Sequence, residues 1–505
     1  MPSNPVVETR SGKLQGVYEN GLSVFKGIPY ATPPVGALRW LPPQPVKPWP
    51  GVRSAENFGP IAFQPAPEFQ APREPLPVES QDEDCLFLNV WTPGLDDKKR
   101  AVMVWIHGGG YSLGSGSEPN QPNRHTLSLR GDIVLVTINY RLGPLGFLHL
   151  NEITGGKIPA TGNEGLLDQV AAVRWVRDNI AAFGGDPANI TIFGESAGAM
   201  SVGALLALPA AKGLFHKAVM QSGASTCHSL EDAVTEATKL VKALGLTGRD
   251  ADKLRRIPAQ TLIETQHTMW AWKIRGAPVE PVIDGKVLPV LPLDAVQAGS
   301  AKDITIMAGS NLDEGTLFYG MEPRIVNQNE DDLIRRTGRI VPEKDVPALV
   351  EAYRQALADR WGRTPTPGEI YVAISGDSQF RLPGLRMVEA QQRLGTPAFS
   401  YLFDFVGTAA QLGSCHSLDV GFIFSSTTRE FHGAGPIIDR LTMQMQEAWT
   451  AFARTGNPTC PSLGNWPDYG RQRRTMVLGR DSRVVAAPYE TERRAWDTIE
   501  NKWLG

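Results

Sequence analysis

A serine stands between a predicted strand and a predicted helix, within the sequence Gly-Glu-Ser-Ala-Gly at residues 194–198. Residues 190–193 before it are β-branched or aromatic, as in a strand buried on both faces, and the small residues from Ala197 onward are typical of a helix. A sharp strand-to-helix turn lifts a serine hydroxyl clear of the sheet, but it tolerates only small residues two positions away. The stretch therefore predicts a nucleophile elbow with Ser196 as the attacking group.

A serine nucleophile needs a general base, usually a histidine, which a carboxylate orients. In folds with such an elbow the acid and then the histidine follow the serine, each on a loop after a late strand. This order disfavours six of the eight histidines, namely His107, His125, His149, His216, His228 and His267. His416 and His432 remain, and His416 is favoured because its Gly/Ser-rich loop follows a predicted strand at 398–405.

Three carboxylates are candidates for the acid. The predicted strand at 304–308 leads into a polar loop that carries Asp313 and Glu314 side by side, and their spacing does not choose between them. Asp284 is the third candidate, but its Asp-Gly sequence is explained more simply by a turn.

The elements around these residues alternate between strand and helix patterns. Strands are predicted at 84–91, 101–106, 133–140, 190–194, 218–223, 304–308 and 398–405, and the clearest helices at 164–183 and 437–454. Such alternation implies right-handed crossovers and a large, mostly parallel, twisted sheet flanked by helices. Residues 6–60 read as an antiparallel ribbon. We expect one α/β domain over residues 1–505, with helical cap insertions at about 229–275 and 328–393.

Composition narrows the possible partners and compartments. The 505 residues are 42% hydrophobic and carry a net charge of −3, which predicts a globular protein without an electrostatic footprint for nucleic acid or anionic membranes. No apolar run approaches the ~20 residues of a membrane span, and the N-terminal residues do not resemble a signal peptide. The four scattered cysteines suggest neither a zinc site nor a redox motif. We expect a cytoplasmic protein, a monomer or small homo-oligomer, without metal or cofactor.

Taken together, the motifs resemble those of the type-B carboxylesterase family. The matching segments span most of the chain, at residues 25–31, 83–90, 162–169, 183–187, 194–198, 221–223 and 452–458. The resemblance implies an α/β-hydrolase fold and a serine esterase. It makes Ser196 the nucleophile, Glu314 the acid and His416 the base.

The resemblance also implies roles for residues around the triad. Backbone N–H groups at Gly109, Gly110 and Ala197 match the family's oxyanion hole, and Gly109 and Gly110 belong to a run of three glycines that lets the backbone fold tightly. Glu195 and Ser222 match polar positions that support the site. Aromatic residues in the cap segments are candidates for lining the substrate pocket, namely Trp270, Trp272, Phe318 and Tyr319.

Two departures from the family pattern stand out. Residues 416–419 read His-Ser-Leu-Asp where the family usually has His-Gly-x-Glu, so Asp419 replaces a longer side chain. Secreted relatives pair the cysteine that matches Cys85 with one near residues 61–63, which here are apolar and lack cysteine. The missing bridge agrees with a reducing compartment.

The expected reaction is two-step acyl transfer from small or medium carboxylic esters through an acyl-serine. The same triad would serve a hydrolase of amides, carbamates or lactones, and specificity would reside in pocket shape. A binding protein that keeps the fold is a third possibility, which the presence of all three triad residues disfavours.

Overall fold

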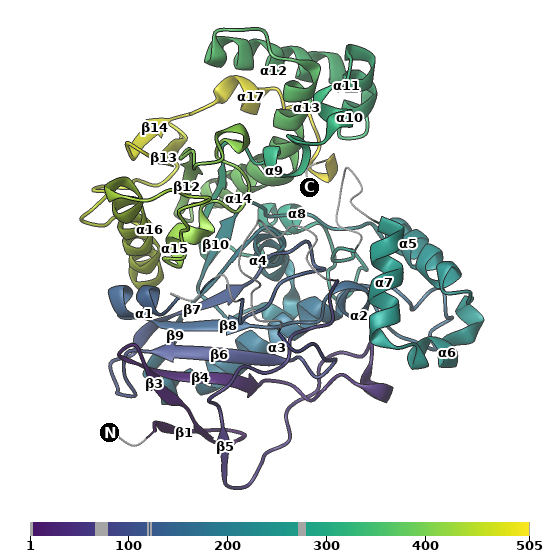
Figure 1. The fold of residues 1–505 in the computed structure, drawn as a ribbon, viewed down its shortest axis with the longest axis vertical. Coiled ribbons are helices and arrows are strands. Elements are labelled where there is room, and N and C mark those ends of the chain that lie inside the picture. Colours follow the sequence, from purple (N-terminus) through teal and green to yellow (C-terminus); the bar gives the residue numbers. More distant parts are fainter. Residues whose placement is uncertain (1–3, 66–78, 119–120, 122–123, 271–278, 504–505) are drawn as a thin grey trace.

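An eleven-stranded mixed sheet forms the centre of the molecule (Figure 1). The computed structural model describes residues 4–65, 79–118, 121, 124–270 and 279–503. In spatial order the strands are β14 (Arg483–Ala486), β13 (Arg474–Leu478), β12 (Ala398–Phe403), β11 (Thr305–Asn311), β10 (Lys217–Gln221), β9 (Gly185–Glu195), β7 (Arg100–Ile106), β8 (Val134–Ile138), β6 (Phe87–Thr92), β4 (Leu22–Pro29) and β3 (Val17–Glu19).

The run from β8 through β7 and β9 to β13 is parallel, and antiparallel strands extend the sheet at both ends. Every residue of β7, β8, β10 and β12 is buried, as expected for strands covered by helices on both faces. The predicted α/β class with a mostly parallel central sheet is therefore confirmed.

The N-terminal ribbon is antiparallel, as predicted, but it divides between two sheets. β1 (Val6–Thr9) pairs with β2 (Gly12–Gln15), and β5 (Val52–Ser54) adds to β2 in parallel. β3 and β4 instead form a hairpin at the edge of the large sheet. The ribbon thus extends the edge of the large sheet and adds a small sheet beside it.

Two hydrophobic layers cover the large sheet. Along β7, Val102 and Val104 face one layer, while Met103 and Trp105 face the other, as the two-residue period of a strand requires. The first layer includes α3 (Glu164–Asn179), α4 (Ala197–Ala207), α8 (Pro292–Gln297) and α14 (Leu382–Arg393). The second includes α1 (His125–Gly131), α15 (Val420–Ile423) and α16 (Pro436–Thr455).

Two further groups of helices have cores of their own and lie at different places around the sheet (Figure 1). The first comprises α5 (Leu230–Ala243), α6 (Ala251–Arg256) and α7 (Ala259–Trp270), together with contacts from α2 (Gly143–Gly146). The second comprises α9 (Thr316–Tyr319), α10 (Pro323–Val326), α11 (Glu330–Thr337), α12 (Val346–Trp361) and α13 (Pro367–Gly376), with α17 (Glu490–Arg494) packed on α12. Among the described residues, no helix is long and apolar enough to cross a membrane.

Candidate active site

Ser196 occupies the turn between β9 and α4, in a backbone conformation that side chains rarely adopt. Its φ is 57° and its ψ is −128°. Hydrogen bonds on both sides fix this conformation: the Ser196 N–H donates to Gln221 O at 2.9 Å, and the Met200 N–H donates to Ser196 O at 2.9 Å. The elbow geometry inferred from the sequence is present.

The flanking glycines are required because the end of β7 lies against the turn. A Cβ on Gly198 would be 2.0 Å from Ile106 O, and a Cβ on Gly194 would be 2.6 Å from the same oxygen. Both distances are far below van der Waals contact, and the atoms met are backbone atoms that cannot rotate away. The structure thus explains the spacing of small residues around Ser196.

His416 and Glu314 meet at the carboxyl edge of the sheet, in the loops after β12 and β11. His416 Nδ1 is 2.6 Å from Glu314 Oε2, and both side chains are buried. The other carboxylate oxygen, Oε1, accepts the Asn311 N–H at 2.7 Å. This backbone bond fixes the carboxylate, which in turn orients the imidazole.

The other two candidate acids make different contacts. Asp313 Oδ2 accepts the Ser414 N–H at 2.9 Å, so it joins the loop after β11 to the loop that carries His416. Asp284 Oδ1 caps a turn by accepting the N–H groups of residues 286–288. His432, the second candidate base, accepts the Thr428 N–H through Nδ1. Of the residues left open by the sequence, Glu314 and His416 are the pair in contact.

The second imidazole nitrogen of His416 faces another carboxylate. His416 Nε2 is 3.1 Å from Glu195 Oε1, and the same oxygen accepts the Ser417 hydroxyl at 2.5 Å. Among the described residues, the Ser196 hydroxyl makes no hydrogen bond to His416. The base therefore rests between Glu314 and Glu195.

The protonation of this cluster follows from burial and mutual charge. Burial opposes the imidazolium, yet Glu195 and then Glu314 raise the pKa of His416 to about 9. Burial raises the pKa of Glu195 to about 7, although His416 and the Ser417 hydroxyl favour its ionised form. Both neighbouring carboxylates thus favour the protonated form of His416.

Asp419 is a third carboxylate near the base. It follows His416 by three residues and is completely buried. Its Oδ2 accepts hydrogen bonds from Gln221 Nε2 at 3.0 Å and from the Tyr401 hydroxyl at 3.1 Å. Burial raises its pKa to about 6. The shorter Asp419 is thus supported by donors on β10 and β12, which the sequence pattern did not reveal.

An aromatic wall packs on the imidazole. The Phe380 and His416 ring centroids are 4.4 Å apart, Phe318 is 5.1 Å from His416, and the two phenyl rings stack at 5.8 Å. Phe318 was predicted at the site, whereas Phe380 was missed because its helical segment follows no strand or motif. Tyr319 lies mainly in the core of α9–α13.

The remaining pocket candidates, Trp270 and Trp272, lie at or after the end of α7. Trp270 is the last residue of α7, and its side chain and the whole of Trp272 lie outside the described residues. Their proposed contribution to the pocket stays a prediction.

The glycine-rich loop after β7 lies directly beside the elbow. A Cβ on Gly108 would be 3.1 Å from Ser196 Cβ and 2.8 Å from Glu195 O. Gly109 and Gly110 have φ values of 103° and 58°, which let the loop turn tightly over the serine. Ala197 is the first residue of α4, so its N–H has no partner within the helix. The glycine-rich loop and the first turn of α4 thus both lie beside Ser196.

Ser222 directly follows the neighbouring strand β10 and is completely buried. Its hydroxyl has no hydrogen-bond partner among the described residues. It lies beside the elbow because Gln221 pairs with Glu195. The predicted supporting position is therefore adjacent to the site, although no direct bond joins it to the triad.

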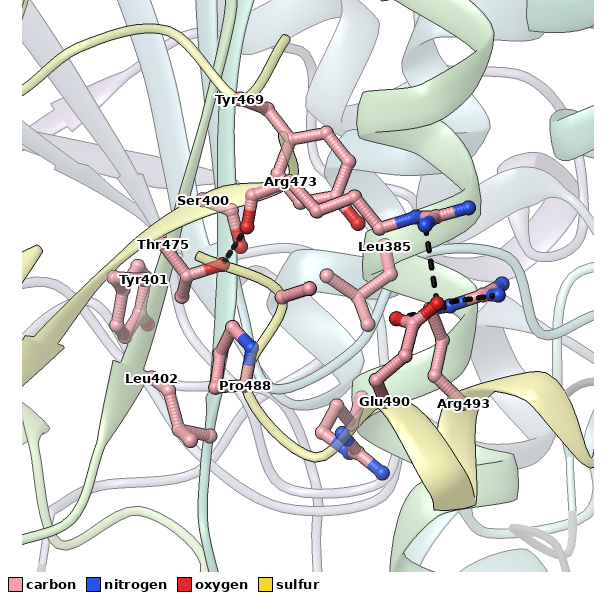
Figure 2. A pocket seen from close by; sticks show the side chains of 12 residues that line it. Leu385, Ser400, Tyr401, Leu402, Tyr469, Arg473, Thr475, Pro488, Glu490 and Arg493 are labelled. Atoms are coloured by element: carbon pink, nitrogen blue, oxygen red, sulfur yellow. Dashed lines mark hydrogen bonds and ion pairs between the residues drawn. The ribbon is translucent and has the colours of Figure 1, made fainter. Parts of the chain in front are cut away.

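The cavity drawn in Figure 2 is a separate feature, enclosed by α14, β12, β13 and residues 487–493. It is lined partly by arginines. Arg473 and Arg493 both pair with Glu490, at 3.1 and 2.9 Å. None of its lining residues belongs to the elbow or to the loops that carry Glu314 and His416.

The four cysteines all belong to the described residues and form no disulfide there. Cys85, Cys227, Cys415 and Cys460 are free thiols. No group of three or more His, Cys, Asp or Glu side chains with metal-binding geometry occurs among the described residues.

Comparison with known proteins defines the class. A model of the carboxylesterase family matches residues 3–496. A para-nitrobenzyl esterase of Bacillus subtilis (strain 168) is 37% identical over 97% of this chain and 98% of its own. A phenmedipham hydrolase of Pseudarthrobacter oxydans is 36% identical over 96% of this chain and 97% of its own. Among solved structures, a carboxylesterase of Geobacillus stearothermophilus superposes with a TM-score of 0.87 at 39% identity, covering 97% of this chain and 100% of that one.

The chain therefore belongs to the carboxylesterase family and has the α/β-hydrolase fold. It is a serine carboxylic ester hydrolase, as the resemblance implied.

Proposed function

We propose that Ser196, Glu314 and His416 form the catalytic triad of this esterase and that its substrates are small or medium carboxylic esters. The observation that carries the assignment is the 2.6 Å contact between Glu314 Oε2 and His416 Nδ1, made at the edge of the sheet where the elbow presents Ser196. Glu314 holds the imidazole with Nδ1 protonated, so that Nε2 is the atom that exchanges a proton.

In acylation, neutral His416 turns Nε2 from Glu195 to Ser196 and accepts the hydroxyl proton while Ser196 Oγ attacks the ester carbonyl. Catalytic hydrogen bonds of this kind are often absent from the free enzyme and form in the complex. The tetrahedral intermediate collapses when His416 returns the proton to the leaving alkoxide, which departs as an alcohol. A water then loses a proton to His416 and attacks the acyl-serine. The second tetrahedral intermediate collapses when His416 gives that proton to Ser196 Oγ, which releases the acid and restores the serine hydroxyl.

Backbone N–H groups of Gly109, Gly110 and Ala197 are proposed as the oxyanion hole. Their support is position: the glycine-rich loop lies beside Ser196, and the first turn of α4 begins directly after it. Fixed donors stabilise the charge that develops on the carbonyl oxygen, and losing one donor typically costs about 10²-fold or more in rate.

The surroundings of the imidazole support an apolar ester as substrate. Phe318 and Phe380 pack on the His416 ring, so the group that approaches Ser196 on that side meets phenyl faces. Such a wall favours an uncharged acyl or alcohol group and disfavours a charged one.

We also infer that the protein works in a reducing compartment as a monomer or small homo-oligomer, without nucleic acid. Four unpaired thiols and a net charge of −3 support this inference.

The test is the release of p-nitrophenol from acetate and butyrate esters, with Ser196→Ala as the matched variant. We expect turnover by the parent and a fall of at least about 10³-fold in kcat for Ser196→Ala. A fluorophosphonate probe, which captures activated serines, should attach to Ser196 in the parent, as read by peptide mass spectrometry. Turnover of p-nitroanilides or carbamates in preference to esters would move the substrate class to amides or carbamates. Absence of both turnover and labelling would contradict the triad assignment.

A further inference from the structure

Ser417 is a non-glycine residue held in a left-handed conformation immediately after the proposed base. Its φ is 65°, a region that glycine enters freely and other residues enter at a cost in free energy. Residues of this kind persist where surrounding contacts compensate the strain, and they concentrate at functional sites. The contact made by the Ser417 side chain therefore indicates what the conformation serves.

That contact is with Glu195. The Ser417 hydroxyl donates to Glu195 Oε1 at 2.5 Å, and this oxygen is also the one 3.1 Å from His416 Nε2. One carboxylate oxygen thus joins the hydroxyl after the base to the nitrogen that must serve Ser196. Glu195 itself is buried and is the residue directly before Ser196.

We propose that Ser417 is a positioning residue that holds the Glu195 carboxylate on His416 Nε2, and that this contact sets the pH at which the base becomes available to Ser196. The inference rests on the proposed triad and deepens it. Ser417 acts through Glu195 and His416 and contacts neither the substrate nor the reacting oxygen.

The proton inventory explains why the contact matters. A neutral imidazole carries one N–H, so it cannot donate to Glu314 and Glu195 together. With both carboxylates ionised, the two contacts are satisfied only by the imidazolium, which cannot accept the proton of Ser196. An ionised Glu195 therefore delays the release of His416 to higher pH, and it also stabilises the imidazolium formed in the transition state.

Several elements contribute charge or surface to this cluster. Glu195 comes from β9, Glu314 from the loop after β11, and Asp419 from the loop that carries His416. The remaining faces of the imidazole meet the uncharged rings of Phe318 and Phe380. Asp419 keeps its own donors when Ser417 changes, so substitution of Ser417 acts mainly on Glu195.

The sign of the effect is set by the hydrogen bond. The hydroxyl donates to the carboxylate and so favours its ionised form; without it, the pKa of Glu195 rises. A protonated Glu195 no longer favours the imidazolium, so the pKa of His416 falls. The acidic limb of kcat/KM, which reports the base in the free enzyme, should move to lower pH.

The experiment compares pH profiles of kcat/KM for p-nitrophenyl acetate in the parent, Ser417→Ala and Ser417→Gly. Both variants lose the hydroxyl, but only alanine retains the strained backbone. We expect both acidic limbs to shift down by about half a pH unit or more, with a plateau about two- to fivefold lower. Ser425→Ala is the matched control, because Ser425 is also left-handed (φ 50°) and its hydroxyl contacts Gln446, on α16; its profile should match the parent.

A double variant isolates the path of the effect. Glu195→Gln should shift the limb in the same direction, and adding Ser417→Ala should produce no further shift, because the two residues act on the base through one contact. Additive shifts would overturn the proposal. A change confined to Ser417→Ala, with Ser417→Gly matching the parent, would assign the effect to the backbone and would also overturn it.

Titration of the His416 Nδ1–H resonance by proton NMR gives a readout that does not need activity. Performed on Ser196→Ala with and without Ser417→Ala, it should give a lower pKa for His416 when the hydroxyl is absent. Equal pKa values would refute the role of Ser417. Absence of ester turnover in the parent would instead contradict the triad. The titration would still test whether Ser417 acts on His416 through Glu195.

Discussion

Ser196 and Ser222 stand at the carboxyl ends of neighbouring parallel strands, and both have a positive φ. Their φ values are 57° and 56°. Each N–H donates to a carbonyl of the next strand, from Ser196 to Gln221 O on β10 and from Ser222 to Gly309 O on β11. Residue type, positive φ and backbone pairing are thus shared, yet only Ser196 is proposed as a nucleophile.

The two serines differ in the segment that comes after each of them and in the groups that face each hydroxyl. Ser196 directly precedes α4, is partly exposed and lies beside the glycine-rich loop. Ser222 is followed by Gly223 and no helix, and its hydroxyl is buried without a hydrogen-bond partner in the described structure. On the proposed assignment, a strained serine at a strand end is not sufficient for a nucleophile, which also needs access, a helix N-terminus and a base.

The sharpest way to break this contrast is to remove the base. In His416→Gln, Ser196 keeps its elbow but has no group to accept its proton, so we expect kcat to fall by about 10³-fold or more. Ester turnover and fluorophosphonate labelling of Ser196 are the measurements. If Ser196 still labels at the parental rate in a folded His416→Gln protein, the elbow alone activates it and the contrast with Ser222 needs another cause.

The second test separates adjacent acids. Glu314→Gln leaves the shape of the site but removes the charge that orients and stabilises the imidazolium, so we expect a loss of about 10²- to 10⁴-fold in kcat. Asp313→Asn is the matched control, since Asp313 bonds the Ser414 N–H and does not contact His416. We expect Asp313→Asn to lower kcat by less than about tenfold. Its main effect should be on thermal stability. A reversed order of the two losses would exchange their roles.

The sequence predicted the elements that carry this contrast more readily than the contacts. Buried strands and the glycine spacing around Ser196 are local patterns, so the elbow and the parallel sheet could be read directly. The choice between Asp313 and Glu314 could not be predicted from the sequence. Adjacent side chains leave a loop in different directions, and these directions depend on the turn after Asn311.

Contacts between segments that are distant in the chain could not be predicted from the sequence either. Phe380 lies in the helical segment Asp377–Arg381, far from any motif, and Ser417 meets Glu195 across 222 residues. Such pairs are set by how loops after different strands converge at one edge of the sheet. Only the unusual Ser417, where the resembled family usually has glycine, offered a signal.

The smallest expected effect is that of Ser222→Ala, which tests whether Ser222 takes no part in catalysis, in contrast to Ser196. The change deletes a buried hydroxyl that has no partner among the described residues, so little binding or orientation is lost. We expect kcat/KM for p-nitrophenyl acetate within about threefold of the parent. The free energy of unfolding should be unchanged or higher by up to about 1 kcal/mol, because an unpaired buried hydroxyl is costly. Denaturant unfolding and steady-state kinetics measure both. A loss of tenfold or more in kcat/KM with unchanged stability would mean that the Ser222 hydroxyl supports the base through a bridging water, and the two serines would then belong to one catalytic network.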